Sequence, residues 1–68
     1  MTVEELKKEV MMKSINKPKS WRLGQFIFNY IDEKYGVSRI VQFNDKVDCF
    51  YDDKNIDNFL FHAVKYIS

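Results

Sequence analysis

The sequence predicts an all-α domain, a small bundle of three main helices at about residues 2–14, 20–35 and 53–67 with a short connecting helix near 37–43. Three observations favour this fold. Apolar residues recur at helical spacing in the long segments, residues typical of helix starts and ends flank them, and only two Gly and one Pro interrupt the chain. An α+β fold with a hairpin at about 39–51 is the alternative.

The first helix begins with a capping signal. Thr2 is followed three residues later by Glu5, so that the hydroxyl and the carboxylate can each bind a backbone amide at the helix start. The helix carries a narrow apolar stripe, formed by Val3, Leu6 and Val10. Such a stripe limits what the helix contributes to the core. The basic segment 15–20 follows, and its Pro18 predicts a linker.

The second helix is expected to be central. Ser20 is a plausible N-cap, and Gly36 can end the helix in the left-handed conformation. Its apolar residues cover more than half of the helix circumference; they are Leu23, Phe26, Ile27, Phe28, Tyr30, Ile31 and Tyr35. An arc this wide requires two partners. Gly24 lies within the arc, where we expect close approach of a neighbouring element.

Residues 37–51 fit two structures. A short helix near 37–43 places Val37, Ile40, Val41 and Phe43 on its apolar side, opposite Ser38, Arg39 and Gln42. A hairpin would instead use the Asn44-Asp45 turn and the alternating residues that follow it. Helical spacing fits better, so we favour the helix.

The last helix can be capped by Asp52 or Asp53 and has a clean apolar face. Phe61 is the exception, because helical geometry places its ring on the polar side. We expect it to be an aromatic anchor inside a polar rim formed by Asp57, His62 and Lys65. The expected partner is a protein, either a second copy of the chain or a heterologous one.

Composition argues against catalysis. The sequence has one Cys and one His, too few for a closed zinc site and without the companion residues of a nucleophilic active site. It also has no Gly-rich phosphate-binding loop. We expect no catalytic residues, no cofactor, no metal site and no small-molecule substrate. Without an apolar run long enough for a membrane span or signal peptide, the chain is predicted to be cytoplasmic with no membrane partner. The predicted function is a small non-enzymatic protein-interaction or regulatory module.

A nucleic-acid accessory function is the alternative. The net charge is +1, but residues 1–22 hold six Lys or Arg against three Glu. The segment 13–22 combines four cations with an indole ring, as surfaces that bind phosphates and stack bases do. Its candidate binding residues are Lys13, Lys17, Lys19, Trp21 and Arg22. Nucleic acid is nevertheless the less favoured partner, because four cations are few.

The runs R-L-G-Q-F-I-F-N-Y-I, Y-G-V-S-R-I-V-Q-F, V-D-C-F-Y-D-D and I-D-N-F-L span residues 22–60. This pattern resembles a group of short uncharacterised bacterial and prophage-type proteins. The resemblance implies kinship but no activity, and it omits the helix 2–14 and linker 15–20 of the single predicted domain. It draws attention to five polar residues, which we expect to form a structural network: Arg22, Gln25, Asn29, Asp52 and Asp53.

Overall fold

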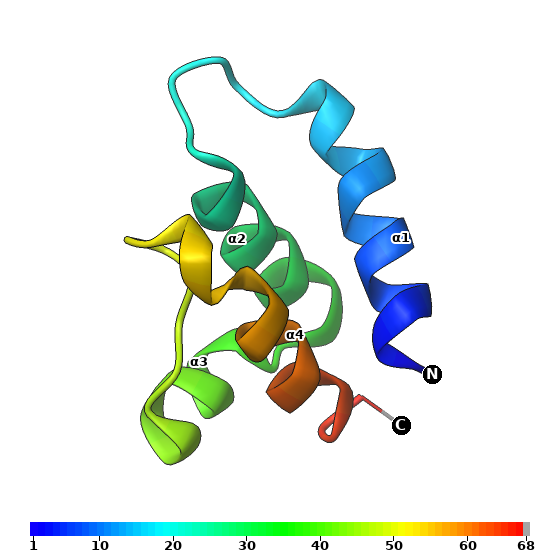
Figure 1. Ribbon diagram of the computed structural model, residues 1–68, viewed down its shortest axis with the longest axis vertical. Helices are drawn as coiled ribbons and strands as arrows, with labels where there is room; N and C mark the ends of the chain where they lie inside the picture. Colours follow the sequence, from blue (N-terminus) through cyan, green and yellow to red (C-terminus); the bar gives the residue numbers. More distant parts are fainter. Residues whose placement is uncertain (68) are drawn as a thin grey trace.

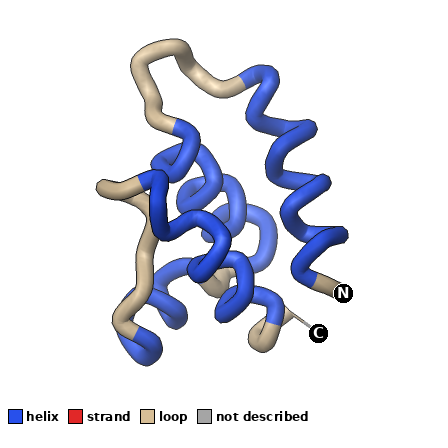
Figure 2. The backbone as a smooth tube through the Cα atoms, viewed as in Figure 1, coloured by secondary structure: helices blue, strands red, loops and turns tan. Residues whose placement is uncertain are grey.

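Residues 1–67 of the computed structural model are described, and they contain helices and loops but no strand (Figures 1 and 2). The α-helices are α1 (Val3–Lys13), α2 (Leu23–Tyr35), α3 (Ser38–Ile40) and α4 (Ile56–Val64). Short 3₁₀ or π turns join them: η1 (Ser14–Asn16), η2 (Val41–Asp45) and η3 (Asp53–Asn55). The all-α prediction is therefore confirmed, and residues 39–51 form no hairpin.

α2 is the central helix, as its wide apolar arc predicts. It contacts α1, α3 and η3, and α1 also packs along α4. In Figure 1 the linker after α1 crosses at the top of the view, while the start of α1 and the end of α4 lie together at the bottom. No helix in residues 1–67 combines the length and the apolar character needed to cross a membrane.

The core contains side chains from every α-helix or its immediate flank. Its buried members are Leu6, Val10, Ile27, Phe28, Ile31, Val37, Val41, Cys49, Ile56, Phe59, Leu60 and Ala63. The Phe28 ring lies 5.6 Å from the rings of both Phe50 and Phe59, centroid to centroid. Aromatic contacts at this distance stabilise the fold beyond the area they bury.

Two predicted helix ends are confirmed. At the start of α1 the Glu5 amide donates to Thr2 Oγ1 at 3.1 Å, and the Thr2 amide donates to Glu5 Oε1 at 2.8 Å. At the end of α2, Gly36 has φ +69°. Its amide donates to the carbonyl groups of Ile31 and Asp32. Glycine occupies this left-handed region without the Cβ penalty of other residues.

The predicted start of the second helix is wrong by three residues. Ser20 does not cap α2, because the helix begins at Leu23 and Arg22 is the extended residue before it. Arg22 itself makes no side-chain cap. The Gly24 amide instead donates to Asp53 Oδ1 at 2.9 Å, so a carboxylate from a distant segment caps the helix. A residue 29 positions away leaves no local signal.

The connecting helix is also different from the prediction. α3 spans only three residues and continues as the π-helical turn η2, which ends at Lys46 with φ +58°. A π turn closes hydrogen bonds five residues apart, so it rotates side chains differently from an α-helix. Ile40 is 40% exposed and Phe43 is 77% exposed. The expectation that both lie on a buried apolar side is therefore wrong.

Candidate functional site

The outer face of α4 presents an aromatic side chain to solvent. Phe61 is 52% exposed, which confirms the predicted helical phase. The His62 ring meets the Phe61 ring edge-on with centroids 5.5 Å apart, and Lys65 Nζ lies 4.6 Å from the Phe61 centroid. Asp57 Oδ1 accepts a hydrogen bond from Lys7 Nζ at 2.7 Å, while the Asp57 side chain stays 77% exposed.

We call this the α4 face, defined by Asp57, Phe61 and Lys65. The third predicted rim residue, His62, lies mostly under the surface, with 23% of its side chain exposed. Its Nδ1 lies 3.5 Å from Asp45 Oδ2 in η2. Tyr66 donates to the same oxygen at 3.0 Å, and this bond raises the pKa of the Tyr66 hydroxyl. His62 Nδ1 makes no hydrogen bond within residues 1–67, so His62 is packed between α4 and η2 and takes little part in the open face.

The predicted polar network forms only in part, at the start of α2. Arg22 donates to the Phe50 carbonyl, and its Nε lies 3.9 Å from Asp53 Oδ1. Asp52 caps η3 by accepting from the Lys54 amide at 2.9 Å. Gln25 and Asn29 make no side-chain hydrogen bond within residues 1–67, so their place in the network is not supported. Arg22 and Asp53 tie the irregular segment 48–53 to the start of α2, whereas Asp52 caps a turn within its own segment.

The basic segment 13–22 uses half of its cations internally. Lys17 Nζ donates to the Trp21 carbonyl at 2.8 Å, and Arg22 binds the Phe50 carbonyl. Lys13 and Lys19 are exposed, and Trp21 is half-buried. Two exposed cations beside a half-buried indole offer few contacts for a nucleic-acid backbone.

A carboxylate on α1, that of Glu9, has the densest polar contacts of residues 1–67, and it was not selected in the sequence analysis. Glu9 accepts hydrogen bonds from Tyr30 at 2.7 Å and from Tyr35 at 2.9 Å. Lys34 Nζ completes the cluster at 2.8 Å from Glu9. A signal was nevertheless present in α2, because its apolar arc contains two tyrosines. Their hydroxyls need hydrogen-bond partners when another helix packs over them.

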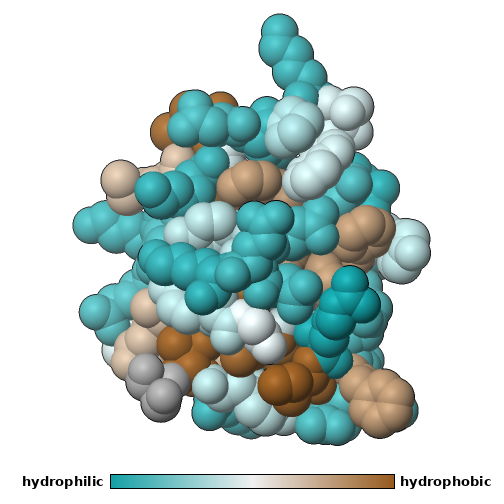
Figure 3. Space-filling view, turned by 180° about the vertical axis from the view of Figure 1, so that it is seen from behind, coloured by the Kyte–Doolittle hydropathy of each residue, from teal (hydrophilic) through white to brown (hydrophobic). Residues whose placement is uncertain are grey.

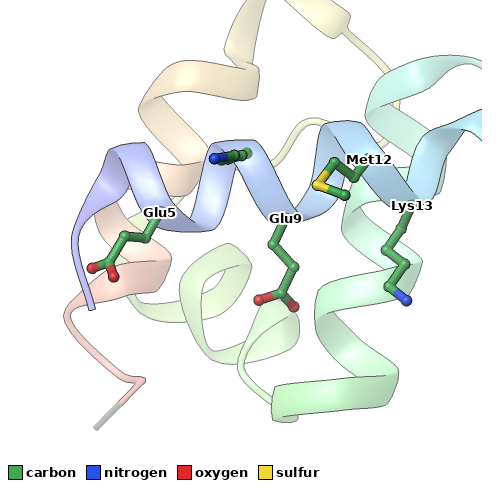
Figure 4. A pocket seen from close by; sticks show the side chains of 5 residues that line it. Glu5, Glu9, Met12 and Lys13 are labelled. Atoms are coloured by element: carbon green, nitrogen blue, oxygen red, sulfur yellow. The ribbon is translucent and has the colours of Figure 1, made fainter.

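Glu9 also lies in a shallow groove along α1 (Figure 4). The groove is lined by Glu5, Lys8, Glu9, Met12 and Lys13. All of these residues come from one helix. The carboxylate of Glu9 already accepts hydrogen bonds from side chains of α2. Glu9 therefore serves the contact between α1 and α2, and the groove offers no assembled ligand site.

The hydrogen bonds to Glu9 predict a pH-dependent contribution to stability. Burial alone would raise the pKa of this carboxyl, but the bonds from Lys34 and the two tyrosines outweigh it and hold the pKa below its ordinary value of 4.5. The ionised form therefore stabilises the fold above that value, and the contribution is lost as the pH falls through the folded-state pKa. Glu9→Gln is expected to reduce the free energy of unfolding by about 1–2 kcal/mol at neutral pH.

Urea titrations of wild type and Glu9→Gln at several pH values measure this contribution. The difference between the two proteins should shrink as the pH falls below 4.5, the ordinary pKa of the carboxyl. Glu4→Gln is the matched control, because Glu4 is exposed on the same helix, and it should shift stability by less than about 0.5 kcal/mol. A Glu9→Gln difference that stays constant with pH would contradict the assignment.

The thiol of Cys49 is a core group. It is fully buried, and its Sγ donates to the Gly24 carbonyl at 3.2 Å. Burial, followed by the nearby Asp48 carboxylate, raises the pKa of the thiol to about 12. Cys49 and His62 thus have different neighbours: the thiol bonds to the Gly24 carbonyl, and His62 Nδ1 lies 3.5 Å from Asp45 without a hydrogen bond.

We expect Cys49 in the folded protein to resist alkylation. At mildly alkaline pH almost none of the thiol is ionised, and the reagent cannot reach it without local opening. Iodoacetamide should modify native protein at least about 100-fold more slowly than protein unfolded in guanidinium. Mass spectrometry of timed samples gives both rates. Equal rates would place the thiol at the surface.

Two further exposed aromatic side chains escaped the sequence analysis. Phe43 is 77% exposed with Lys46 Nζ 5.3 Å from its ring centroid, and Tyr51 is 76% exposed. In Figure 3 strongly hydrophobic residues lie at the lower end of the molecule, where η2 and the end of α4 lie in Figure 1, and others lie at the upper end. Phe43 lies in the π turn η2, and no simple residue pattern marks a change from α to π geometry.

No protein-family model, curated protein or solved structure matches this chain. The resemblance of residues 22–60 to short bacterial and prophage-type proteins therefore stays a prediction.

Proposed function

We propose that the chain is a small protein-interaction module that binds its partner through the α4 face. The observation that carries this proposal is the half-exposed ring of Phe61 between the oppositely charged side chains of Asp57 and Lys65. An aromatic anchor surrounded by polar groups is typical of the residues that contribute most to protein binding. Burial of the rest of the ring by a partner would add hydrophobic stabilisation that the isolated domain lacks.

The ring is also positioned before any partner binds. The His62 edge and the Lys65 ammonium hold it on two sides, and His62 is in turn close to Asp45 in η2. A side chain that is already ordered loses little rotational freedom on binding, so more of its contact energy contributes to affinity. This arrangement favours the interpretation of Phe61 as a binding anchor over that of a ring exposed by chance.

A non-enzymatic function agrees with the state of the reactive groups. Cys49, the one thiol, is buried with a pKa raised to about 12, which disfavours a nucleophile. The carboxylate with the most contacts, Glu9, is saturated by α2. The nucleic-acid alternative has less support, because Lys17 and Arg22 in the basic segment bind backbone carbonyls.

Differential capture from a lysate of the source cell tests the proposal. Wild type, Phe61→Ser and Phe43→Ser are immobilised, and the retained proteins are quantified after nuclease treatment. Phe43→Ser is a close control, because it removes another exposed ring that also lies under a lysine. We expect Phe61→Ser to lose about 10- to 100-fold of the binding of one retained protein. Phe43→Ser should keep it.

The melting temperature of Phe61→Ser should stay close to that of wild type, because the ring is half-exposed. Unchanged retention by Phe61→Ser contradicts the proposal. Retention that disappears with nuclease, or falls steeply with salt, favours the nucleic-acid alternative and its residues Lys13 and Lys19.

A further inference from the structure

We propose that the partner seated on the α4 face is a second copy of the chain, with the two α4 helices antiparallel about a twofold axis at Phe61. The inference rests on the proposed function, since it names the partner of the same surface. Its basis is the order of charge along α4. Asp57, Phe61 and Lys65 follow one another at four-residue steps, with the acid on one side of the ring and the base on the other.

Helical geometry places these three side chains on one face. Residues four apart on a helix lie side by side, with Cβ atoms about 5–6 Å from each other. α4 is assigned to Ile56–Val64, and Lys65 continues the helical backbone with φ −65° and ψ −25°. Asp57 and Lys65 therefore lie at opposite ends of a short exposed strip with Phe61 at its centre.

A twofold axis through that centre makes the strip complementary to itself. In an antiparallel pair, the residue four positions before Phe61 faces the residue four positions after Phe61 of the other copy. Asp57 then faces Lys65 twice in the dimer, and the two Phe61 rings meet at the axis. A parallel pair would instead oppose Asp57 to Asp57 and Lys65 to Lys65, which is unfavourable. The charge order thus selects both the occupant and its direction.

The charged groups are accessible for these contacts. Asp57 uses Oδ1 for Lys7, and its side chain is 77% exposed, so Oδ2 can accept a second donor. Lys65 is exposed, and its ammonium already lies 4.6 Å from the Phe61 centroid, over the centre of the face. A small shift of this flexible side chain brings the ammonium to a carboxylate of the second copy.

The size of the surface predicts a weak and reversible dimer. α4 has nine residues, so it is roughly 13 Å long. A standard interface buries about 800 Å² per partner, which is a large share of the 4543 Å² exposed by this chain and more than one short helix face provides. We therefore expect a dissociation constant on the order of 100 µM.

Sedimentation equilibrium from about 10 µM to about 2 mM measures the dimer, and charge variants test its direction. In a dimer of Lys65→Glu, two carboxylates face each other at each contact between positions 57 and 65. In a dimer of Asp57→Lys, two ammonium groups face each other there. Each variant should dimerise at least about 10-fold more weakly than wild type. An equimolar mixture of the two should recover the affinity as a heterodimer, since every acid then faces a base. Phe43→Ser is the control and should dimerise as wild type does.

Three outcomes overturn the antiparallel dimer: a wild type that stays monomeric to about 2 mM, a Phe61→Ser variant that dimerises as well as wild type, or a mixture that recovers nothing. Circular dichroism of each variant verifies that it is folded. If the wild type is monomeric but its capture of a lysate protein depends on Phe61, the dimer is excluded and the proposed function stands. Capture that is independent of Phe61 overturns the proposed function itself.

Discussion

Ile27→Asp is expected to unfold the domain at neutral pH. Ile27 has no exposed surface and belongs to the core formed by α1, α2 and α4. An aspartate there would be an unpaired charge in an apolar environment, which costs several kcal/mol, and the lost apolar contacts add to that cost. A domain of this size has a stability of about 5 kcal/mol, so the substitution removes most or all of it.

Far-UV circular dichroism and thermal melting measure the result. Ile27→Asp should lose most of its helical signal at 25 °C or melt without a cooperative transition. Ile15→Asp is the matched control, because it makes the same chemical change at an isoleucine in η1 that is 82% exposed. The control should change stability by less than about 0.5 kcal/mol. A cooperative melt of Ile27→Asp near the wild-type temperature would show that this face of α2 is not buried.

The features that the sequence predicted correctly depend on residues close together in the chain. The capping of α1 uses Thr2 and Glu5, three residues apart, and the end of α2 uses one glycine with positive φ. The exposure of Phe61 follows from the helical period of α4 alone. Periodicity and capping are local properties, so they can be derived before the fold is known.

The features that the sequence did not predict depend on contacts between distant segments. Asp53 caps α2 from 29 residues away, and Glu9 binds two tyrosines more than 20 residues away. The chain changes to a π turn after Ile40, although the residues of that turn fit an α-helix. Pairings of this kind depend on the tertiary arrangement, which overrides local preference. The α4 face could be predicted because exposure needs no partner within the chain.

Gly24 shows how closely one distant segment approaches α2. A Cβ added at this position would lie 2.1 Å from the Cys49 carbonyl oxygen and 2.8 Å from Asp53 Oδ1. The nearer atom belongs to the backbone, so the clash cannot be relieved by rotating a side chain. The backbone of Gly24 also holds this segment, through its amide to Asp53 and its carbonyl to Cys49. Any shift that makes room for a side chain breaks these bonds.

Gly24→Ala is therefore expected to reduce the free energy of unfolding by about 2–4 kcal/mol. Helix propensity predicts the opposite sign, because alanine is favoured over glycine by about 1 kcal/mol inside an open helix. The sign of the change thus separates close packing from local preference. Urea titration with a fixed m-value measures it.

Gly36→Ala is the matched control in the same helix. A Cβ on Gly36 meets nothing within 4 Å, but φ is +69°, so alanine there costs about 1–2 kcal/mol through backbone strain alone. The two variants should also differ at Cys49. Displacement of residues 48–53 in Gly24→Ala should speed alkylation of that thiol at least about 10-fold, whereas Gly36→Ala should speed it much less. A Gly24→Ala protein that is more stable than wild type would mean that the segment 48–53 does not lie against α2.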